Sequence, residues 1–479
     1  MENKQKTLKK NSIISLLSLF FQSGYSAVLG LIANLVLTIV LAPEVFGIYI
    51  LTLSIISFLN YFSDIGLAAS LVQKDEVTGD DLRTTFTVQQ LLIIILITIG
   101  FLLTPVVRSF YDLPSEAMYL YWALLVAFFF SSLKTIPSIK LERQVQFQKI
   151  VLVQIVENTV FYIAVSVFAL SGMGLMSFAY AVLIRAITGT ILIYYISFWL
   201  PQIGISKVSL KKLLSFGIPF QTNTLLALVK DDLILLFIGK ALGLEALGYI
   251  GWAKRWAESP IRMIMDNVNR ILFPIFSRMQ SEQERVAQLL EKVIRYQTLI
   301  LAPAFVGMVL LMDRFVDLVP KYSKWEPALP IFYLIVISAF LSSFSSPFTN
   351  LFNALGKVKI TFKFMVYWTV MSWILIPILT STNSMIGYPI ALIILSLTFI
   401  AIIVVAKKYV AFSFIKQIYP GIFSSLFMGV MVYITLFQTS TWILFGLSIA
   451  TGVISYTLIL YLVFKINIMN EVTSFFKYD

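Results

Sequence analysis

Apolar segments of about twenty residues follow one another along the whole chain, and short polar loops separate them. An α-helix rises about 1.5 Å per residue, so twenty residues cross the roughly 30 Å hydrocarbon core of a bilayer. The sequence therefore predicts an all-α polytopic membrane protein. Fourteen transmembrane helices are expected, near 13–42, 45–63, 85–107, 116–133, 150–170, 174–199, 213–238, 246–277, 289–311, 328–351, 360–380, 385–406, 417–437 and 441–464. Twelve is the alternative number, because the second segment is short and the eighth is strongly polar.

The composition agrees with this class. Hydrophobic residues make up 59% of the chain and charged residues 13%, whereas soluble proteins carry about 25% charged residues. The chain contains no cysteine and no histidine, which excludes disulfides, thiolate or imidazole metal ligands, and catalysis by either residue. The loops, each of roughly twenty residues or fewer, leave no room for an extramembrane catalytic domain. We expect a protein that is not an enzyme and holds no metal.

Lysine and arginine are distributed unevenly over the loops. Of the 36 residues, 25 fall in the two tails and in every second loop, five fall in the opposite loops, and six lie within apolar segments. Cytoplasmic loops of membrane proteins collect Lys and Arg, so both termini are expected in the cytoplasm and the number of spans is expected to be even. Because the excess charge is spread over many loops, it does not form a nucleic-acid-binding patch.

The eighth segment, 246–277, carries an unusual number of charges for a transmembrane helix. Arg255, Glu258, Arg262, Asp266 and Arg270 follow one another at steps of three, four, four and four, which places them on one side of a regular helix with alternating sign. A charge at the bilayer centre costs about 2.5–3.5 kcal/mol, so this charged stripe is expected to face protein or a water-filled cavity. The alternative interpretation is that these residues form a ladder of salt bridges with a structural role only.

The charged stripe has a surplus of positive charge, and Lys254 adjoins it, which favours an anionic substrate. Pro260 interrupts the segment and predicts a kink or local unwinding. Two tryptophans beside the stripe would stack on sugars, or would serve as interfacial anchors. The predicted substrate-binding residues are Lys254, Arg255, Arg262, Arg270, Trp252 and Trp256.

A second group of intramembrane charges, Lys230, Asp231 and Asp232, lies in segment 213–238. Neighbouring carboxylates in a low dielectric would exchange a proton or coordinate a sodium ion; alternatively they pair with Lys230 and the charged stripe. Apart from such a coupling ion, no cofactor is expected. Glu157 and Arg185 are expected to pair with each other. The predicted ion-coupling residues are Asp231, Asp232, Glu258 and Asp266.

A faint internal repeat relates the two halves of the chain. Residues 43–47 align with residues 244–248 at an offset of 201, with Glu and Gly matching. An offset of six spans predicts two pseudo-symmetric lobes of the same orientation around a central cavity. The lobes are expected at 1–206 (helices 1–6) and 207–406 (helices 7–12), followed by two additional helices in 407–479.

Short runs near the ends of the segments carry a family resemblance. They are Ala42-Pro43-Glu44-Val45-Phe46-Gly47-Ile48-Tyr49, Phe62-Ser63-Asp64-Ile65-Gly66-Leu67 with Gln73-Lys74, Leu214-Ser215-Phe216-Gly217-Ile218-Pro219, Asp231-Asp232 with Ile238-Gly239-Lys240, Phe273-Pro274-Ile275-Phe276-Ser277-Arg278 and Asn353-Ala354-Leu355-Gly356-Lys357. In this order, over about residues 10 to 360, they resemble the polysaccharide-transporter branch of the multidrug/oligosaccharidyl-lipid/polysaccharide exporter superfamily, the Wzx-type flippases. The last four segments match by hydropathy only.

This resemblance implies a function. Such a protein moves a lipid-linked oligosaccharide, usually on undecaprenyl diphosphate, across a bacterial or archaeal cytoplasmic membrane by alternating access. The product would be O-antigen, capsule or exopolysaccharide, and a polysaccharide polymerase or glycosyltransferases would be partners. The alternatives are a multidrug or organic-cation antiporter of the same superfamily, whose cavity would carry a net negative charge, and a membrane polysaccharide polymerase, which would need a large catalytic loop.

One feature departs from the lipid II flippases of this superfamily. Those proteins are expected to place arginines in their N-terminal lobe, whereas segment 13–42 contains no charged residue. The chain is therefore not expected to be a peptidoglycan-precursor flippase of that type.

Overall fold

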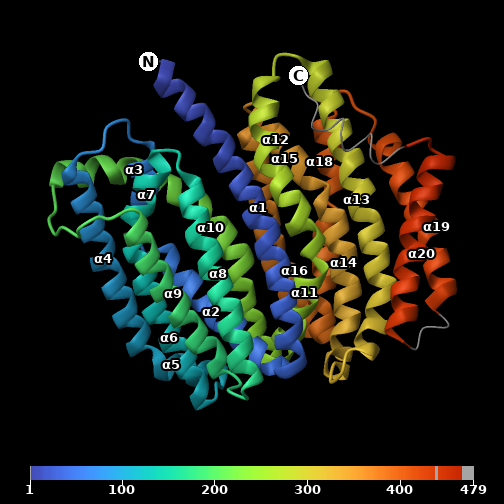
Figure 1. Ribbon diagram of the computed structural model, residues 1–479, viewed down its shortest axis with the longest axis horizontal. Coiled ribbons are helices and arrows are strands. Elements are labelled where there is room, and N and C mark those ends of the chain that lie inside the picture. The colour runs from blue at the N-terminus through green and yellow to red at the C-terminus, as the bar shows by residue number, and fades with distance from the viewer. Residues whose placement is uncertain (1, 437–440, 467–479) are drawn as a thin grey trace. The chain divides into compact units, whose positions relative to one another are not determined.

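The computed structural model describes residues 2–436 and 441–466, and within them it leaves out the side chains of 2–13, 16–17, 220, 222–224, 266–267 and 270–271. Every regular element in the described residues is a helix (Figure 1), which confirms the all-α class. The chain divides into two compact units, 1–251 and 252–479. The predicted lobe limits at 206 and 406 and the central cavity stay predictions.

The first unit is built from helices that lie side by side. Here α1 packs against α8, α8 against α9, α6 against α9, and α10 against α2. Helix α11 begins in this unit and ends beyond its boundary. The helices are α1 (Glu2–Val40), α2 (Pro43–Tyr61), α3 (Leu67–Gln73), α4 (Gly79–Leu102), α5 (Thr104–Tyr111), α6 (Ser115–Leu133), α7 (Thr135–Arg143), α8 (Phe147–Leu170), α9 (Met176–Ile196), α10 (Lys207–Leu242) and α11 (Leu244–Ala257).

The second unit is also built from helices that pack side by side. Helix α13 packs against α19, α19 against α20, and α14 against α17; α13, α19 and α20 are seen in yellow to red in Figure 1. Its elements are η1 (Ile261–Met265), α12 (Asp266–Arg278), α13 (Gln283–Leu318), η2 (Ser323–Ala328), α14 (Leu329–Ser343), α15 (Ser345–Ala354), α16 (Val358–Asn383), η3 (Ser384–Ile386), α17 (Gly387–Ser396), α18 (Phe399–Ala406), α19 (Phe414–Leu436) and α20 (Trp442–Leu462).

Eleven helical stretches of the described residues are long and apolar enough to cross a membrane. One of them, Val358–Ala406, contains two of the expected segments, 360–380 and 385–406, joined at η3. Segments 213–238 and 246–277 are helical too, but they are not among the eleven. A polytopic membrane protein is thus confirmed, and the count of fourteen stays a prediction.

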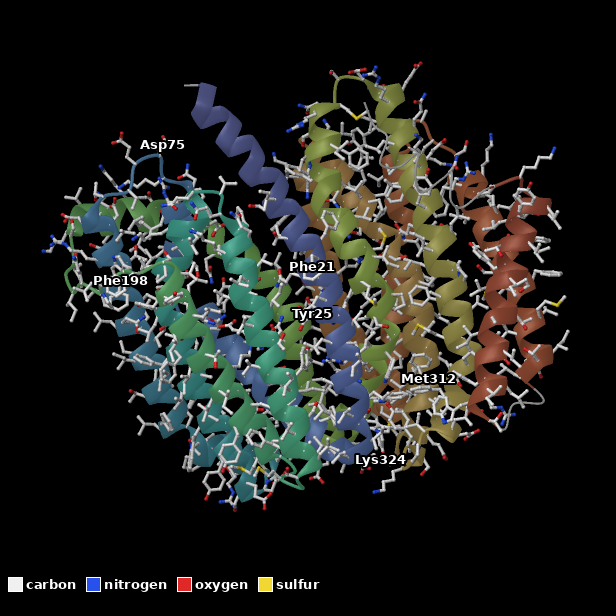
Figure 2. All side chains as sticks on the ribbon, viewed as in Figure 1. Phe21, Tyr25, Asp75, Phe198, Met312 and Lys324 are labelled. Atoms are coloured by element: carbon white, nitrogen blue, oxygen red, sulfur yellow. The ribbon has the colours of Figure 1, made fainter. Side chains whose placement is uncertain are left out.

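Polar side chains join residues 15–26 of α1 to residues 148–159 of α8. In a bilayer no hydrophobic force draws helices together, so hydrogen bonds of about 0.6 kcal/mol each and close packing hold them. The Tyr25 hydroxyl lies 2.8 Å from the Thr159 hydroxyl, and Figure 2 labels Tyr25 on α1. Further pairs along the same contact are Ser15 with Gln148 (2.9 Å), Gln22 with Gln154 (2.7 Å) and Ser26 with Asn158 (3.0 Å).

The two copies of the internal repeat touch each other at the N-terminal ends of α2 and α11. A Cβ placed on Gly47 would lie 1.7 Å from the carbonyl oxygen of Leu244, and a Cβ on Gly248 would lie 1.9 Å from that of Pro43. At the offset of 201, Pro43 corresponds to Leu244 and Gly47 to Gly248, so the two contacts are reciprocal. Only glycine permits this approach of backbone to backbone. We call this contact the glycine crossing.

Lys134 is one of the 25 lysines and arginines expected in the cytoplasmic tails and loops, but in the structure it lies inside the first unit. Helices α6 and α7 meet at Lys134, whose backbone remains helical, and together they form one candidate span, Ser115–Arg143. The Lys134 Nζ is 2.5 Å from Glu157 Oε1, and the two side chains are 20% and 7% exposed. The expected Glu157–Arg185 pair is wrong: the Arg185 guanidinium lies over the Phe161 ring, 5.6 Å from its centroid.

We expect Glu157→Ala to destabilise the protein strongly. The substitution leaves the Lys134 ammonium without its carboxylate, and an unpaired charge of this kind costs about 3–5 kcal/mol. Combining it with Lys134→Met should recover most of the loss, because no charge then remains unpaired. Thermal unfolding followed by size-exclusion chromatography of the solubilised protein measures both effects. A single Glu157→Ala variant as stable as the wild type would contradict this interpretation.

Candidate functional site

The charged stripe begins on α11 and is interrupted near its middle. Helix α11 ends at Ala257, and Pro260 has no amide hydrogen to donate to the carbonyl of Trp256, four residues earlier. The Ser259 hydroxyl donates to that carbonyl instead, at 2.8 Å. The predicted interruption at Pro260 is confirmed, and Ser259, which the sequence did not single out, is part of it.

A π-helix, η1, follows the interruption and leads into α12. A π-helix turns through fewer degrees per residue than an α-helix, so spacings of three and four no longer keep side chains on one side. The expectation of one regular helix is therefore wrong across 258–265. The side chains of Asp266 and Arg270 lie outside the described residues, and their assignment to the site stays a prediction.

Glu258 connects two of the predicted basic residues. Its Oε2 accepts a hydrogen bond of 2.7 Å from Arg262 Nη2, and its Oε1 lies 3.9 Å from Lys254 Nζ. The Arg262 side chain is 63% exposed, compared with 26% for Glu258, so the guanidinium keeps donors available for another group. Arg255 is exposed on the same helix. Three cations and one carboxylate thus leave this end of the stripe with a net positive charge.

Trp252 lies in the core of the second unit and is 2% exposed. Its indole ring stacks on Trp325, with centroids 5.6 Å apart, and its Nε1 donates to the hydroxyl of Tyr322 at 3.1 Å. Phe332 lies against the same ring. In this conformation Trp252 offers no face to a sugar; it anchors α11 to the connection between α13 and α14.

Trp256 remains accessible in part. Its ring meets Phe315 edge to face, with centroids 5.6 Å apart. The indole Nε1 is buried and has no hydrogen-bond partner among the described residues. Of the two predicted tryptophans, only Trp256 keeps a surface that a ligand can reach.

The two neighbouring aspartates point to different partners, because successive residues of a helix are about 100° apart. Asp231 pairs with Lys230 at 2.6 Å and is 55% exposed. Asp232 accepts a hydrogen bond of 2.9 Å from the Ser57 hydroxyl, which belongs to α2. The structure adds Ser57 to this group, a residue that no pattern in the sequence had indicated.

Comparison with known proteins identifies a family model and several relatives that this chain matches. A family model described as polysaccharide biosynthesis protein matches residues 36–330. The chain is 25% identical over 432 residues to the lipopolysaccharide biosynthesis protein WzxC of Escherichia coli (strain K12), covering 90% of this chain and 84% of that protein. It is 24% identical over 316 residues to the teichuronic acid biosynthesis protein TuaB of Bacillus subtilis (strain 168), covering 65% and 64%.

Solved structures share the fold at low sequence identity. The lipid II flippase MurJ in an inward closed conformation superimposes with a TM-score of 0.75 at 14% identity, covering 95% of this chain and 99% of that one. An inward-facing multidrug resistance transporter of the MATE family superimposes with a TM-score of 0.63 at 16% identity, covering 89% and 99%. The arrangement of helices in this chain is therefore the fold that these structures share.

Proposed function

Because this chain belongs to the polysaccharide biosynthesis protein family, whose model covers residues 36–330, we propose that it is a lipid-linked oligosaccharide flippase. It moves a repeat unit carried on undecaprenyl diphosphate from the inner to the outer leaflet of the cytoplasmic membrane, for assembly into a surface polysaccharide. The relatives named for lipopolysaccharide and teichuronic acid synthesis, and a 23% identical succinoglycan transport protein, support this proposal. Transport proceeds by alternating access, without a catalytic residue of the chain itself.

The observation that carries the proposal is the net positive charge beside Glu258. Arg262, Lys254 and Arg255 exceed the single carboxylate that joins two of them, in a segment whose helix is broken. Broken helices with intramembrane charges are a common way to build a substrate site in transporters. A diphosphate is the group of such a substrate that basic side chains recognise.

The direct test uses purified protein in proteoliposomes. An undecaprenyl-diphosphate-linked oligosaccharide with a fluorescent sugar is placed in one leaflet, and its appearance in the other is followed by accessibility to a quencher. Protein-dependent flipping supports the proposal; flipping no faster than in protein-free vesicles contradicts it. A lipophilic organic cation serves as the second substrate, because the competing multidrug reading requires that it be transported.

Orientation in the membrane forms part of the proposal. Both termini, and the loops near Arg143, Lys211, Lys359 and Lys407, are placed in the cytoplasm by the distribution of Lys and Arg. Reporter fusions at these positions should all be active as cytoplasmic fusions. An external reporter near Lys211 or Lys407 would overturn the orientation and the even number of spans.

We assign ion coupling to Asp232 rather than Asp231. Asp232 is hydrogen-bonded to α2 through Ser57, so its protonation or cation binding acts on the contact between α2 and α10, whereas Asp231 is paired with its own neighbour. Asp232→Asn should lower transport about tenfold and remove its dependence on pH or sodium. Asp231→Asn is the matched control and should keep that dependence. The test is to measure the flipping rates of both variants over a range of pH and sodium concentration. An equal loss of flipping rate in both variants under all conditions would contradict the assignment.

A further inference from the structure

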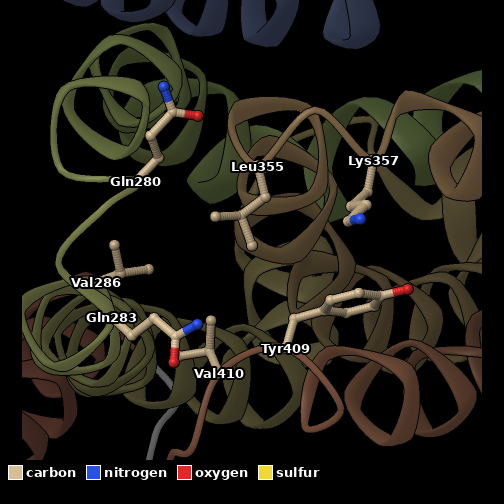
Figure 3. A pocket seen from close by; sticks show the side chains of 7 residues that line it. All are labelled: Gln280, Gln283, Val286, Leu355, Lys357, Tyr409 and Val410. Carbon is tan, nitrogen blue, oxygen red and sulfur yellow. The ribbon is translucent and has the colours of Figure 1, made fainter.

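A cavity in the second unit is lined by none of the predicted site residues and is not used by the proposed function. Its volume is about 270 Å³, and it lies where α12 joins α13, α15 joins α16, and α18 is followed by α19 (Figure 3). By the distribution of Lys and Arg, all three connections are cytoplasmic. The lining residues are Gln280, Gln283, Val286, Leu355, Lys357, Tyr409 and Val410.

The cavity has an apolar floor and a polar rim. Val286 and Val410 are buried and belong to the hydrophobic core of this unit, while Leu355 lies against that core. In Figure 3, Gln280 and Gln283 lie on one side of the cavity and Lys357 and Tyr409 on the other. The rim therefore presents two amides, one ammonium and one phenol.

Lys357 is held at the rim by the end of α15. Gly356 takes a left-handed conformation with φ of +70°, its N–H bonds to the Asn353 carbonyl, and the Lys357 N–H bonds to the Phe352 carbonyl at 2.7 Å. These two bonds form a Schellman motif, which ends a helix and fixes the direction of the next residue. The run Asn353 to Lys357, a sequence match without an assigned role, thus has the role of placing a lysine.

The Lys357 ammonium lies over the Tyr409 ring, 5.5 Å from its centroid. It makes no ion pair with a carboxylate in the described part of the chain. At the start of α13, Glu282 pairs with Arg285 at 3.0 Å, and Glu284 is exposed and does not line the cavity. Further along the helix, Glu291 accepts hydrogen bonds from the Ser413 N–H and from Gln417. A cation supported only by a ring, beside two amide donors and without an acidic residue in the lining, suits an anion.

We propose that this cavity binds the phosphodiester headgroup of an anionic phospholipid from the cytoplasmic leaflet. Helix ends on the cytoplasmic side lie at the depth of the headgroups, where basic pockets recognise such lipids. Pockets for drug-sized ligands hold about 300–1,000 Å³, so a volume of about 270 Å³ fits a single headgroup rather than an oligosaccharide. Lys357 supplies the charge, and Gln280 and Gln283 donate hydrogen bonds to phosphate oxygens.

Native mass spectrometry of the full chain tests the proposal. The protein in detergent is titrated with phosphatidylglycerol, with phosphatidylcholine, or with inorganic phosphate, and the dissociation constant of the first bound ligand is measured. Phosphatidylglycerol should bind more tightly than the other two. Lys357→Ala and Gln283→Ala should each weaken it about fivefold to tenfold. Lys359→Ala removes the same charge from an exposed residue outside the cavity and should change binding by less than about twofold.

Thermal unfolding of each variant confirms that it is folded, and Lys357→Gln, which keeps a long polar side chain, replaces Lys357→Ala if the latter is unstable. The proposal fails if Lys359→Ala weakens binding as much as Lys357→Ala, because the attraction would then be diffuse. It fails equally if phosphatidylcholine binds as tightly as phosphatidylglycerol. Inorganic phosphate that binds as tightly as the lipid would assign the cavity to a free anion.

Discussion

A disulfide between cysteines introduced at positions 50 and 251 is expected to abolish transport, and its reduction is expected to restore it. These two positions correspond to each other in the internal repeat and lie next to the glycine crossing. A Cβ placed on Gly251 lies 3.5 Å from Cγ1 of Ile50, the place that a cysteine Sγ takes. A disulfide needs its two cysteine side chains in direct contact, and cysteine at position 50 also removes the Ile50 Cδ1 that would lie 2.0 Å from the new Cβ.

The physical reason for the loss is that alternating access requires the two repeats to separate at one end of the membrane. Helices α2 and α11 touch through backbone atoms at the glycine crossing, so a movement that separates the repeats there has to break this contact. A covalent bond beside the crossing prevents that movement. We expect less than about 5% of the wild-type flipping rate after oxidation, in line with loss of a required conformational step.

The chain itself makes the experiment clean. It contains no cysteine, so the two introduced thiols are the only ones present. The same double variant under reducing conditions is the control, together with Ile50→Cys alone. Oxidised protein that is fully cross-linked on a gel yet transports at the reduced rate would rule out a moving contact at the glycine crossing.

The second large effect concerns Arg262. We expect Arg262→Lys to lower flipping by about tenfold or more although the charge is retained, because lysine cannot present two planar donors to a diphosphate. Folded yield should not change, since a lysine at 262 can still reach Glu258 and the side chain is largely exposed. Proteoliposome flipping and size-exclusion profiles are measured in parallel.

The paired substitution separates substrate binding from a salt-bridge ladder. If Arg262 serves only to balance Glu258, the combined Arg262→Ala and Glu258→Ala variant should regain function, because no buried charge is left unpaired. If Arg262 binds the substrate, the combined variant should stay inactive. Recovery in the combined variant, or full activity of Arg262→Ala alone, would remove Arg262 from the site.

The class of protein could be predicted from the sequence because the length of each apolar segment and the charges of each loop are properties of short stretches of chain. The interruption at Pro260 could be predicted for the same reason: a missing N–H affects its own turn. Lys134 was assigned to a loop because a charge usually ends an apolar segment. Nothing in the neighbouring sequence indicates that Glu157, on another helix, neutralises it.

Contacts between distant residues account for the remaining differences. Trp252 is a plausible sugar platform until Trp325 and Tyr322, some seventy residues later, cover it. The repeat at 43–47 and 244–248 is visible in the sequence, but that its copies touch each other depends on how their helices cross. Helical periodicity also assumed an α-helix where five residues form a π-helix.

That π-helix gives the charged segment a freedom that a straight α-helix lacks. A π turn stores one surplus residue, and passing that residue to a neighbouring turn leaves the number of backbone hydrogen bonds nearly the same. Each such step rotates the helix on one side of the π turn by about 100° relative to the other. For η1 this means that Arg262 and the residues after it can rotate from one environment to another. Helix α11 does not rotate with them, because Trp252 is packed against Trp325.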